Sequence, residues 1–577
     1  MIVKRVSLES FSGREQYVSA KAIMVQGTGS NVGKSIIVCA LCRIFHEDGI
    51  RVAPFKSQNM SLNSYVTLDG KEMGRAQVAQ AYASGLHPVV EMNPILLKPT
   101  GENGSQVIAM GRPVRNMKAS EYYENKECML DIAIKAYATL EKQFDLIVIE
   151  GAGSPAEINL KDNDIVNMKM AEVANAPVIL VVDIERGGAF AWVVGTLELL
   201  DSAERDRVSG VIINKFRGDL EILKPGIQML EEKINKPVLG VIPYFNDIKI
   251  DDEDSVCLER KGNSRGSYCE MPESECITIA VIRLPSISNF TDFDLLRHEK
   301  GVRLVFIETV SSFGTPDLII IPGTKNTIGD LMFIQENGIA ARILDLAEKG
   351  SMVIGICGGY QMLGNEIRDP QNTESSSSHI KGLGLLDVVT TFFPEKITYQ
   401  VKARLYDNSI GYLHGVACQS AQRAAGGEDS TGNIPYEVTG YEIHMGETEL
   451  LEEALPFSRI IERSGRVIQS GKSDKGEYPG LNDGAVSREG NVMGTYLHGI
   501  FDNDIFRLDI INTLRQKRGL SLLSQSELTV ADSEKEKHYK RLADLTRKHL
   551  DMDLIYTLIG RNSSAAGAGL SGVSMEV

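Results

Sequence analysis

An apolar run that stops at a cysteine constrains this chain more than any other feature. Residues 353–364 read Val-Ile-Gly-Ile-Cys-Gly-Gly-Tyr-Gln-Met-Leu-Gly, so an apolar strand ends at Cys357, two glycines follow, and an apolar helical pattern resumes. This layout is typical of a nucleophile elbow, a tight strand-to-helix turn that exposes a reactive side chain. The helix N-terminus beside the sulfur favours the nucleophilic thiolate. A buried core cysteine is the alternative, but the glycines and the change of period favour a nucleophile.

His498 is the base that the sequence offers for this cysteine. It ends a second short apolar run and is followed by glycine. Catalytic partners are normally distant in sequence, so the separation of His498 from Cys357 fits this role. A third segment, residues 319–327, carries Pro322-Gly323 directly after another apolar run.

These three segments resemble the class I glutamine amidotransferases, which hydrolyse glutamine through a thioester and release ammonia. The resemblance implies that the N–H groups of Gly323 and Gly358 form the oxyanion hole. It also implies a flavodoxin-like α/β domain around Cys357 and His498.

The third catalytic residue departs from that resemblance. The family usually has a glutamate two residues after the histidine, and here this position is Ile500. We therefore expect either a Cys–His dyad or an acid supplied from elsewhere; Asp502 and Glu442 are near in sequence, but nothing places them. The branch of the family in the cobalamin pathway commonly lacks this glutamate. His444 is a tempting second base, but a histidine in a strand is more often structural, and no role is assigned to it.

A glycine-rich loop near the N-terminus predicts a phosphate-binding site. An apolar strand from Ala22 leads through this loop into a helical pattern over Ile36–Phe45. Backbone N–H groups of such a loop bind phosphates, a lysine neutralises them, and a serine can bind Mg²⁺. A chance glycine-rich turn is the less favoured alternative. The predicted nucleotide-binding residues in the loop are Gly27, Thr28, Gly29, Asn31, Val32, Gly33, Lys34 and Ser35.

Polar residues at the ends of later apolar runs extend this site. Glu150 ends the run 144–150, and ligands bind at the carboxyl ends of parallel strands, so Glu150 is the second Mg²⁺ candidate beside Ser35. Asp183 ends the run 178–183 and is a weaker candidate. Asn214 lies where related nucleotide-binding folds recognise the base, and we expect it to contact the nucleotide.

The phosphate loop and the Glu150 strand also carry a resemblance. Gly27 and Gly33 enclose five residues, one more than in the common G-x-x-x-x-G-K-S pattern. This longer loop and the run Glu150-Gly-Ala-Gly resemble the dethiobiotin-synthetase-like branch of P-loop proteins. The resemblance implies ATP as the cofactor and Mg²⁺ held by Ser35 and Glu150.

A densely polar segment over residues 55–80 carries the most specific resemblance. By its residues alone it indicates a polar loop after a strand and then a helix start, which suits a polar ligand or an ordinary solvated loop. Together with Asn93–Pro99, Ser288–Asp294 and Gly440–Gly446, it identifies the chain as a member of the cobyric acid synthase family. The resemblance extends from about Ala22 to about Ile559.

Membership implies a glutamine-dependent amide ligase of cobalamin biosynthesis. Ammonia from the Cys357 site would attack a carboxylate that ATP with Mg²⁺ has phosphorylated. The implied substrate is adenosylcobyrinic acid a,c-diamide, amidated at its b, d, e and g carboxylates. Because bulk water would convert ammonia to ammonium, we also expect a shielded path between the sites. The alternatives are cobyrinic acid a,c-diamide synthase or a related tetrapyrrole amidase and, more distantly, a non-catalytic P-loop ATPase with a degenerate amidotransferase domain.

The charge balance and the cysteines limit the partners and the compartment. Lysine and arginine number 61 against 77 acids, a net charge of −16, and no basic patch stands out, so nucleic acid and membranes are not expected partners. Eight cysteines do not form a disulfide ladder, and Cys39 and Cys42 fall within a predicted helix, so core packing explains their spacing better than a metal. We expect a reduced, cytoplasmic enzyme; the sequence does not predict its oligomeric state.

The pattern of apolar runs predicts two α/β domains. Strands alternate with helices over residues 22–246, which predicts a doubly wound parallel sheet with the P-loop, and a second α/β domain spans 276–519. The other predicted segments are a lead-in (1–21), a polar linker (247–275), a charged helical segment (520–560), a disordered tail (561–577) and flexible insertions at 369–381 and 419–433.

Overall fold

A computed structural model describes residues 19–100, 104–250, 271–374, 377–406, 436–468, 472–473, 476–477 and 481–561. The predicted insertion at 419–433 lies outside the described residues, as do most of the lead-in, of the linker and of the tail. Within the described ranges, none of the helices combines the length and the apolar character that a membrane span requires.

The N-terminal domain is built on a six-stranded sheet of order β12-β11-β10-β1-β9-β2, in which all neighbours are parallel. Alternate residues of β1 face different cores, because Met24 packs in one buried cluster and Ile23 and Val25 pack in another. The predicted doubly wound sheet is confirmed. Its strands are β1 (Lys21–Gly27), β2 (Val52–Phe55), β9 (Leu146–Glu150), β10 (Val178–Asp183), β11 (Val208–Phe216) and β12 (Val238–Pro243).

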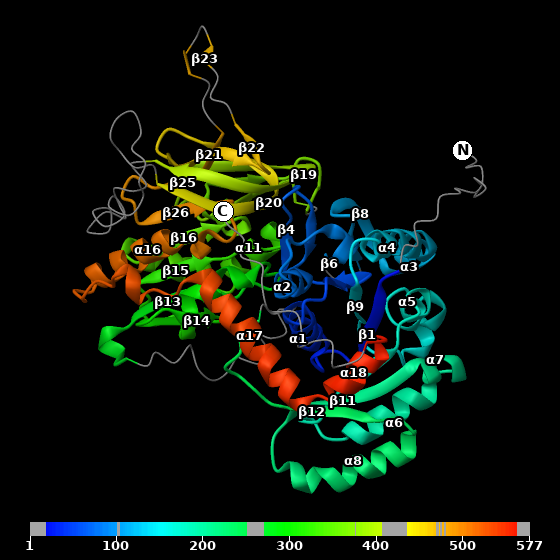
Figure 1. Cartoon of the computed structure of the whole chain (residues 1–577). Helices are drawn as coiled ribbons and strands as arrows, with labels where there is room; N and C mark the ends of the chain where they lie inside the picture. The colour runs from blue at the N-terminus through cyan, green and yellow to red at the C-terminus, as the bar shows by residue number, and fades with distance from the viewer. Residues whose placement is uncertain are drawn as a thin grey trace, which may run out of the picture.

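Helices cover both faces of this sheet (Figure 1). One core includes residues of α2, α4, α5 and α6, and the other includes residues of α1, α17 and α18. The helices up to β12 are α1 (Lys34–Glu47), α2 (Arg75–Ala83), α3 (Ala119–Glu124), α4 (Lys126–Glu141), α5 (Met168–Val173), α6 (Ala189–Leu199), α7 (Ser202–Arg207) and α8 (Leu220–Ile234).

The polar segment that follows β2 is more regular than a loop. It supplies β3 to a second sheet of order β3-β6-β7-β8, while β4 and β5 pair with each other. Backbone pairing to neighbouring strands orders these short polar strands, a long-range effect that periodicity does not reveal. The strands are β3 (Gln58–Met60), β4 (Ser64–Val66), β5 (Glu72–Gly74), β6 (Ile95–Pro99), β7 (Gly104–Ala109) and β8 (Arg112–Lys118).

The C-terminal domain contains a parallel sheet in the order β14-β13-β15-β16-β26. In chain order this is 2-1-3-4-5, the flavodoxin-like arrangement, so the predicted fold class is confirmed. The strands are β13 (Ile277–Ile282), β14 (Val302–Ile307), β15 (Leu318–Ile321), β16 (Met352–Ile356) and β26 (Val492–Thr495), and the helices include α10 (Asp294–His298), α11 (Thr327–Glu336), α12 (Ile339–Glu348), α13 (Gly358–Leu363) and α16 (Asp504–Lys517).

Further strands extend this sheet beyond β26 into a mixed, twelve-stranded sheet. Two of them, β19 and β20, form a long antiparallel pair that reaches toward β4 of the N-terminal domain (Figure 1). The added strands are β17 (Glu366–Arg368), β18 (His379–Lys381), β19 (Val388–Leu405), β20 (Glu437–Leu450), β21 (Leu455–Arg463), β22 (Arg466–Val467) and β25 (Asn482–Val486). The predicted flexible insertion at 369–381 therefore ends in a paired strand, because β18 pairs with β17.

The C-terminal helical segment returns to the N-terminal domain. It forms α17 (Ala531–His549) and α18 (Met552–Leu558), and α17 runs along α1 (Figure 1). Arg547 forms an ion pair of 3.1 Å with Asp48, and the rings of Tyr556 and Phe45 lie 5.9 Å apart. Both ends of the described chain thus contribute to one core.

The cysteines agree with the expectations only in part. Cys39 and Cys42 are free and buried within α1, which confirms core packing. Burial raises the pKa of Cys42 to about 12, although a hydrogen bond from Ser84 opposes the shift. Cys276, however, is disulfide-bonded, so the expectation of a fully reduced chain is wrong at this position.

Candidate active site

Cys357 lies at a sharp turn between β16 and α13. Its backbone adopts φ 53° and ψ −111°, a conformation that is strained for a residue with a side chain. The turn packs tightly against β15, since a Cβ atom on Gly359 would lie 2.0 Å from the carbonyl oxygen of Ile321. The sulfur is buried and lies 3.6 Å from the carbonyl oxygen of Ile443. This geometry is that of the predicted nucleophile elbow.

His498 follows β26, the strand next to β16, and an acid that we did not predict orients it. Its Nδ1 lies 2.6 Å from Oδ2 of Asp292, and the N–H of Gly499 donates to the other carboxylate oxygen at 3.2 Å. Both side chains are buried. Asp292 lies in a short 3-10 helix, η4 (Phe290–Phe293), far earlier in the chain. The structure therefore brings in an acid from elsewhere, and a simple Cys–His dyad does not describe the site.

The charge of Asp292 controls the protonation of His498. Burial alone would lower the pKa of this imidazole, but the nearby Asp292 carboxylate and a hydrogen bond with Cys357 outweigh it and raise the pKa to about 10. His498 is therefore an imidazolium at neutral pH in the resting site. An imidazolium beside a cysteine favours the thiolate.

The two acids that lie near in sequence have other partners. Glu442 pairs with Arg463 at 2.9 Å, and Asp502 lies 3.5 Å from Lys535. His444 stacks on Tyr496 with ring centroids 3.7 Å apart.

The two glycines predicted to form the oxyanion hole lie at the same site. A Cβ atom on Gly323 would lie 2.8 Å from Cε1 of His498, and one on Gly358 would lie 2.7 Å from the methyl carbon of Thr324. Asp330 fixes this loop, since it accepts hydrogen bonds from the Thr324 hydroxyl at 2.5 Å and from the backbone N–H of Ser286 at 3.1 Å. Burial raises the pKa of Asp330 to about 6.

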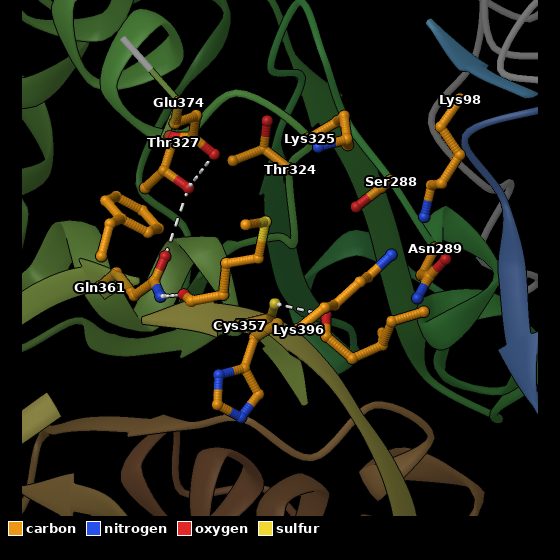
Figure 2. Close-up of a pocket in the computed structure, with 14 residues that line it drawn as sticks. Lys98, Ser288, Asn289, Thr324, Lys325, Thr327, Cys357, Gln361, Glu374 and Lys396 are labelled. Atoms are coloured by element: carbon orange, nitrogen blue, oxygen red, sulfur yellow. Dashed lines mark hydrogen bonds between the residues drawn. The ribbon is translucent and has the colours of Figure 1, made fainter. Parts of the chain in front are cut away.

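A pocket opens beside Cys357 and crosses the domain interface (Figure 2). Lys98 lines it from β6 of the N-terminal domain, and Lys396 lines it from β19. Both ammonium groups reach Glu72, at 2.9 Å and 2.5 Å. The other lining residues are Ser288, Asn289, Thr324, Lys325, Thr327, Gln361, Glu374, Phe392, Ile443, His444 and Met445.

The lysine of the phosphate loop after β1 bonds to backbone carbonyl groups. Lys34 donates from Nζ to the carbonyl oxygens of Gly29 at 2.8 Å and Gly153 at 3.0 Å. Gly33 has φ 105°, and a Cβ atom there would lie 2.1 Å from the side-chain nitrogen of Asn214. Glycine is required at this position by both conformation and space.

Glu150 is the centre of the second site, and four side chains donate to its buried carboxylate. Ser35 at the start of α1 and Lys56 after β2 each lie 2.8 Å from Oε1. Gln80 and Gln77 of α2 donate to Oε2 at 2.5 Å and 3.3 Å. The predicted pair of Ser35 and Glu150 therefore lies together, and sequence reasoning missed Lys56, Gln77 and Gln80 although all three belong to the polar segment.

This oxygen-rich pair suits Mg²⁺ better than a softer metal. Mg²⁺ takes one or two protein oxygens and completes its shell with water and phosphate oxygens. Within the described residues, no group of three or more histidine, cysteine or acidic side chains is arranged to hold a metal alone. The chemistry of the donors thus fits a metal that arrives with a nucleotide.

Asn214 and Asp183 support the phosphate loop from the neighbouring strands. Asn214 donates from Nδ2 to the carbonyl oxygen of Val32 at 2.8 Å. Lys215 bridges Asp183 and the carbonyl oxygen of Asn31, at 2.8 Å and 2.6 Å. The predicted contact of Asn214 with a nucleotide base stays a prediction.

The polar segment also touches the residues that hold His498. Asn63 accepts a hydrogen bond from the hydroxyl of Thr291 at 3.3 Å, next to Asp292. Ser64 donates its N–H to Asn289 at 3.0 Å, and its carbonyl oxygen accepts from the hydroxyl of Tyr441 at 3.3 Å. The Tyr441 ring in turn stacks on His498, with centroids 5.3 Å apart.

Comparison with known proteins finds matches to both domains and to most of the chain. Residues 23–256 match the CobQ/CobB/MinD/ParA nucleotide-binding domain family, and residues 278–506 match the CobB/CobQ-like glutamine amidotransferase domain family. A cobyric acid synthase of Desulforamulus reducens is 49% identical over 94% of this chain and 98% of its own length. Cobyric acid synthases of Clostridium acetobutylicum and Alkaliphilus metalliredigens are 50% and 51% identical, over 93% of this chain and 98% and 99% of their own lengths.

Proposed function

The chain belongs to the cobyric acid synthase family and is a glutamine-dependent amide ligase, and from this premise we propose a division of labour between its two sites. The Cys357 site releases ammonia from glutamine, and the Glu150 site consumes it. The proposed substrate is adenosylcobyrinic acid a,c-diamide, amidated at its b, d, e and g carboxylates with ATP. The observation that carries this proposal is the pocket beside Cys357, because a lysine of the ATP-binding domain lines it.

Glutamine hydrolysis follows from the resting geometry. The Cys357 thiolate attacks the side-chain carbonyl carbon of glutamine and gives a tetrahedral oxyanion, which the N–H groups of Gly323 and Gly358 stabilise. The imidazolium of His498 then donates its proton to the leaving nitrogen, and ammonia departs from the thioester. Neutral His498 next takes a proton from water, whose oxygen attacks the thioester, so that glutamate leaves and the thiolate is regenerated. Asp292 orients the imidazole through both proton transfers.

Amide formation needs an activated carboxylate, because a carboxylate anion does not react with ammonia. In the proposed step a carboxylate oxygen of the corrinoid attacks the γ-phosphorus of ATP, ADP leaves, and an acyl phosphate forms. Lys34 and the backbone N–H groups of the phosphate loop bind the phosphates. Mg²⁺, held by Ser35 and Glu150, would offset phosphate charge in this step. Ammonia attacks the acyl carbon, phosphate leaves with the C–O electron pair, and one proton is lost.

The two sites require a protected passage for ammonia. In neutral water ammonia takes up a proton and loses its nucleophilic lone pair. The pocket beside Cys357 already reaches β6, and Glu72 behind it lies on β5, directly before the helix that carries Gln77 and Gln80 to Glu150. We place the passage along this β5–α2 connection.

Product masses test the function. The protein is incubated with glutamine, Mg-ATP and adenosylcobyrinic acid a,c-diamide, and the corrinoid is followed by mass spectrometry. We expect stepwise conversion of carboxyls to amides, lost in Cys357→Ala, restored there by ammonium, and unaffected by replacing the exposed Cys128 with alanine. Amidation of cobyrinic acid instead would favour the sister enzyme, cobyrinic acid a,c-diamide synthase.

A further inference from the structure

The pocket beside Cys357 holds more positive charge than its own acids balance. Lys98, Lys325 and Lys396 line it, while Glu374 is its one acidic lining residue. Glu72 lies behind the lining and serves Lys98 and Lys396 together, so that two ammonium groups share one carboxylate. This arrangement leaves one positive charge that a ligand anion could balance.

Among the lysines that line the pocket, Lys325 is the one for which the described residues provide no ion-pair partner. Within the described ranges, its ammonium group has no ion pair and no side-chain hydrogen bond, and only its backbone N–H is bonded, to the carbonyl oxygen of Ser286. Burial lowers the pKa of Lys325 and the nearby charge of Lys98 lowers it further, and together they outweigh the opposite influence of the Glu374 and Glu72 carboxylates. A ligand carboxylate would remove both penalties.

Glu374 lines the same pocket, and its carboxylate contacts the first residues of α11. It accepts hydrogen bonds from the backbone N–H of Ile328 at 3.1 Å and from the hydroxyl of Thr327 at 3.5 Å. Figure 2 shows Glu374 and Thr327 on one side of the space above Cys357, and Lys98 and Lys396 on the other. Burial raises the pKa of Glu374 to about 7 in spite of Lys325, so an ammonium group of a ligand would stabilise the carboxylate.

We propose that this pocket binds the charged end of glutamine, with Lys325 on the α-carboxylate and Glu374 on the α-ammonium group. The proposal rests on the proposed glutaminase function, because that function places the glutamine side chain at Cys357. The opposite end of the substrate carries one carboxylate and one ammonium group, and the pocket offers one unpaired cation and one acid. Lys396 and Lys98 add positive potential beside Lys325, but Glu72 holds them in place.

The pairing makes the site selective for an α-amino acid over a simple amide. Each charged hydrogen bond of this kind discriminates by about 10- to 100-fold when one partner is removed. Glutaramate, which lacks the ammonium group, and γ-aminobutyramide, which lacks the carboxylate, each remove one half of the recognition. These two analogues separate the roles of Lys325 and Glu374.

The test measures glutamate release from glutamine in the full reaction mixture, together with the inhibition constant of each analogue. Lys325→Gln is expected to raise the KM for glutamine and the inhibition constant of glutaramate by about 10- to 100-fold, with little change for γ-aminobutyramide. Glu374→Gln is expected to raise the KM for glutamine and the constant for γ-aminobutyramide, with little change for glutaramate. The matched controls are Lys349→Gln and Glu348→Gln, both exposed at the end of α12.

The outcomes separate this proposal from the function on which it rests. A crossed pattern, in which each variant loses the response to one analogue, supports the assignment. The assignment is overturned if each variant raises the inhibition constants of both analogues equally, or if neither variant changes them. In both cases glutamate release by the unmodified protein would still support the glutaminase function. No glutamate release by the unmodified protein overturns both.

Discussion

The two sites of this chain differ in how complete they are before any ligand binds. At Cys357 the proposed base already contacts both the proposed nucleophile and the orienting acid, with 2.6 Å between His498 and Asp292. At Glu150 the groups predicted to bind nucleotide and metal bond to the protein instead, as Lys34 does to Gly29 and Gly153. The glutaminase site is preorganised, and the nucleotide site has to exchange internal bonds for ligand bonds.

The difference reflects whether the charges of each site come from the protein itself or from its ligands. The glutaminase site holds a balanced pair, His498 and Asp292, that needs no outside ion. In the proposed function the nucleotide site receives phosphates and a metal, and before they bind Lys56 balances the charge of Glu150. Variants of the glutaminase site should therefore act by disturbing its geometry, and variants of the nucleotide site should act by weakening ligand binding.

Replacing Glu150 with glutamine should have the largest effect, and the effect should fall mainly on the nucleotide site. The variant keeps the shape but removes the charge on which Ser35 and Lys56 converge, and we expect amidation to fall about 1,000-fold with either glutamine or ammonium. Glutamate release should fall much less. The product is measured by mass, with Glu198→Gln, an exposed acid on α6, as the control. Retained amidation with ammonium would contradict the role of Glu150.

Asp292→Asn should impair the glutaminase site and leave the nucleotide site intact. Without the carboxylate, the largest influence that raises the pKa of His498 is lost, and the pKa should fall from about 10 toward its usual range. Neutral His498 no longer favours the Cys357 thiolate at neutral pH, so glutaminase efficiency should fall about 100-fold. Ammonium-dependent amidation should persist.

The rate of alkylation of Cys357 by iodoacetamide, followed against pH, checks this prediction. In the unmodified protein the charged His498 should keep Cys357 reactive at neutral pH, and in Asp292→Asn alkylation at neutral pH should be slower. Asp294→Asn, in the same motif but 4.0 Å from Arg297, is the control. A profile that Asp292→Asn leaves unchanged would mean that Asp292 does not set the charge of His498.

Asn63→Ala should have the smallest effect, because it removes one hydrogen bond between the two domains. Asn63 belongs to the N-terminal domain but bonds to Thr291, the neighbour of Asp292. We expect glutaminase efficiency to fall about tenfold, with a smaller loss of ammonium-dependent amidation. Thr291→Val and the double variant complete a thermodynamic cycle, in which the two losses should not add. Additive losses would show that this contact does not couple the domains.

Much of the fold and part of each site could be predicted from local sequence. Continuous apolar runs ending in Glu150 and Cys357 mark buried parallel strands, because such strands are apolar on both faces. Asp292 could not be assigned in this way. It lies 206 residues from His498, and only the packing of η4 against the end of β26 brings them together.

Long-range pairing explains the other omissions. The sequence analysis places His444 in a strand, but the long antiparallel pairing of β19 with β20 depends on residues far apart in the chain and could not be read from either segment alone. The return of α17 to α1 likewise depends on contacts such as Arg547 with Asp48, which are distant in sequence. Helices α17 and α18 lie within the segment 520–560 that the sequence predicts to be helical, but the local sequence does not reveal that they pack on the N-terminal domain.

Isotope competition tests the central claim that ammonia passes between the sites without entering bulk water. The protein is supplied with glutamine that carries heavy nitrogen in its amide group, together with excess unlabelled ammonium at neutral pH, and the corrinoid amides are analysed by mass. The account predicts that the new amides carry the heavy nitrogen of glutamine almost entirely. Dilution of the label in proportion to the ammonium would contradict it, because the two sites would then be linked only through the solvent.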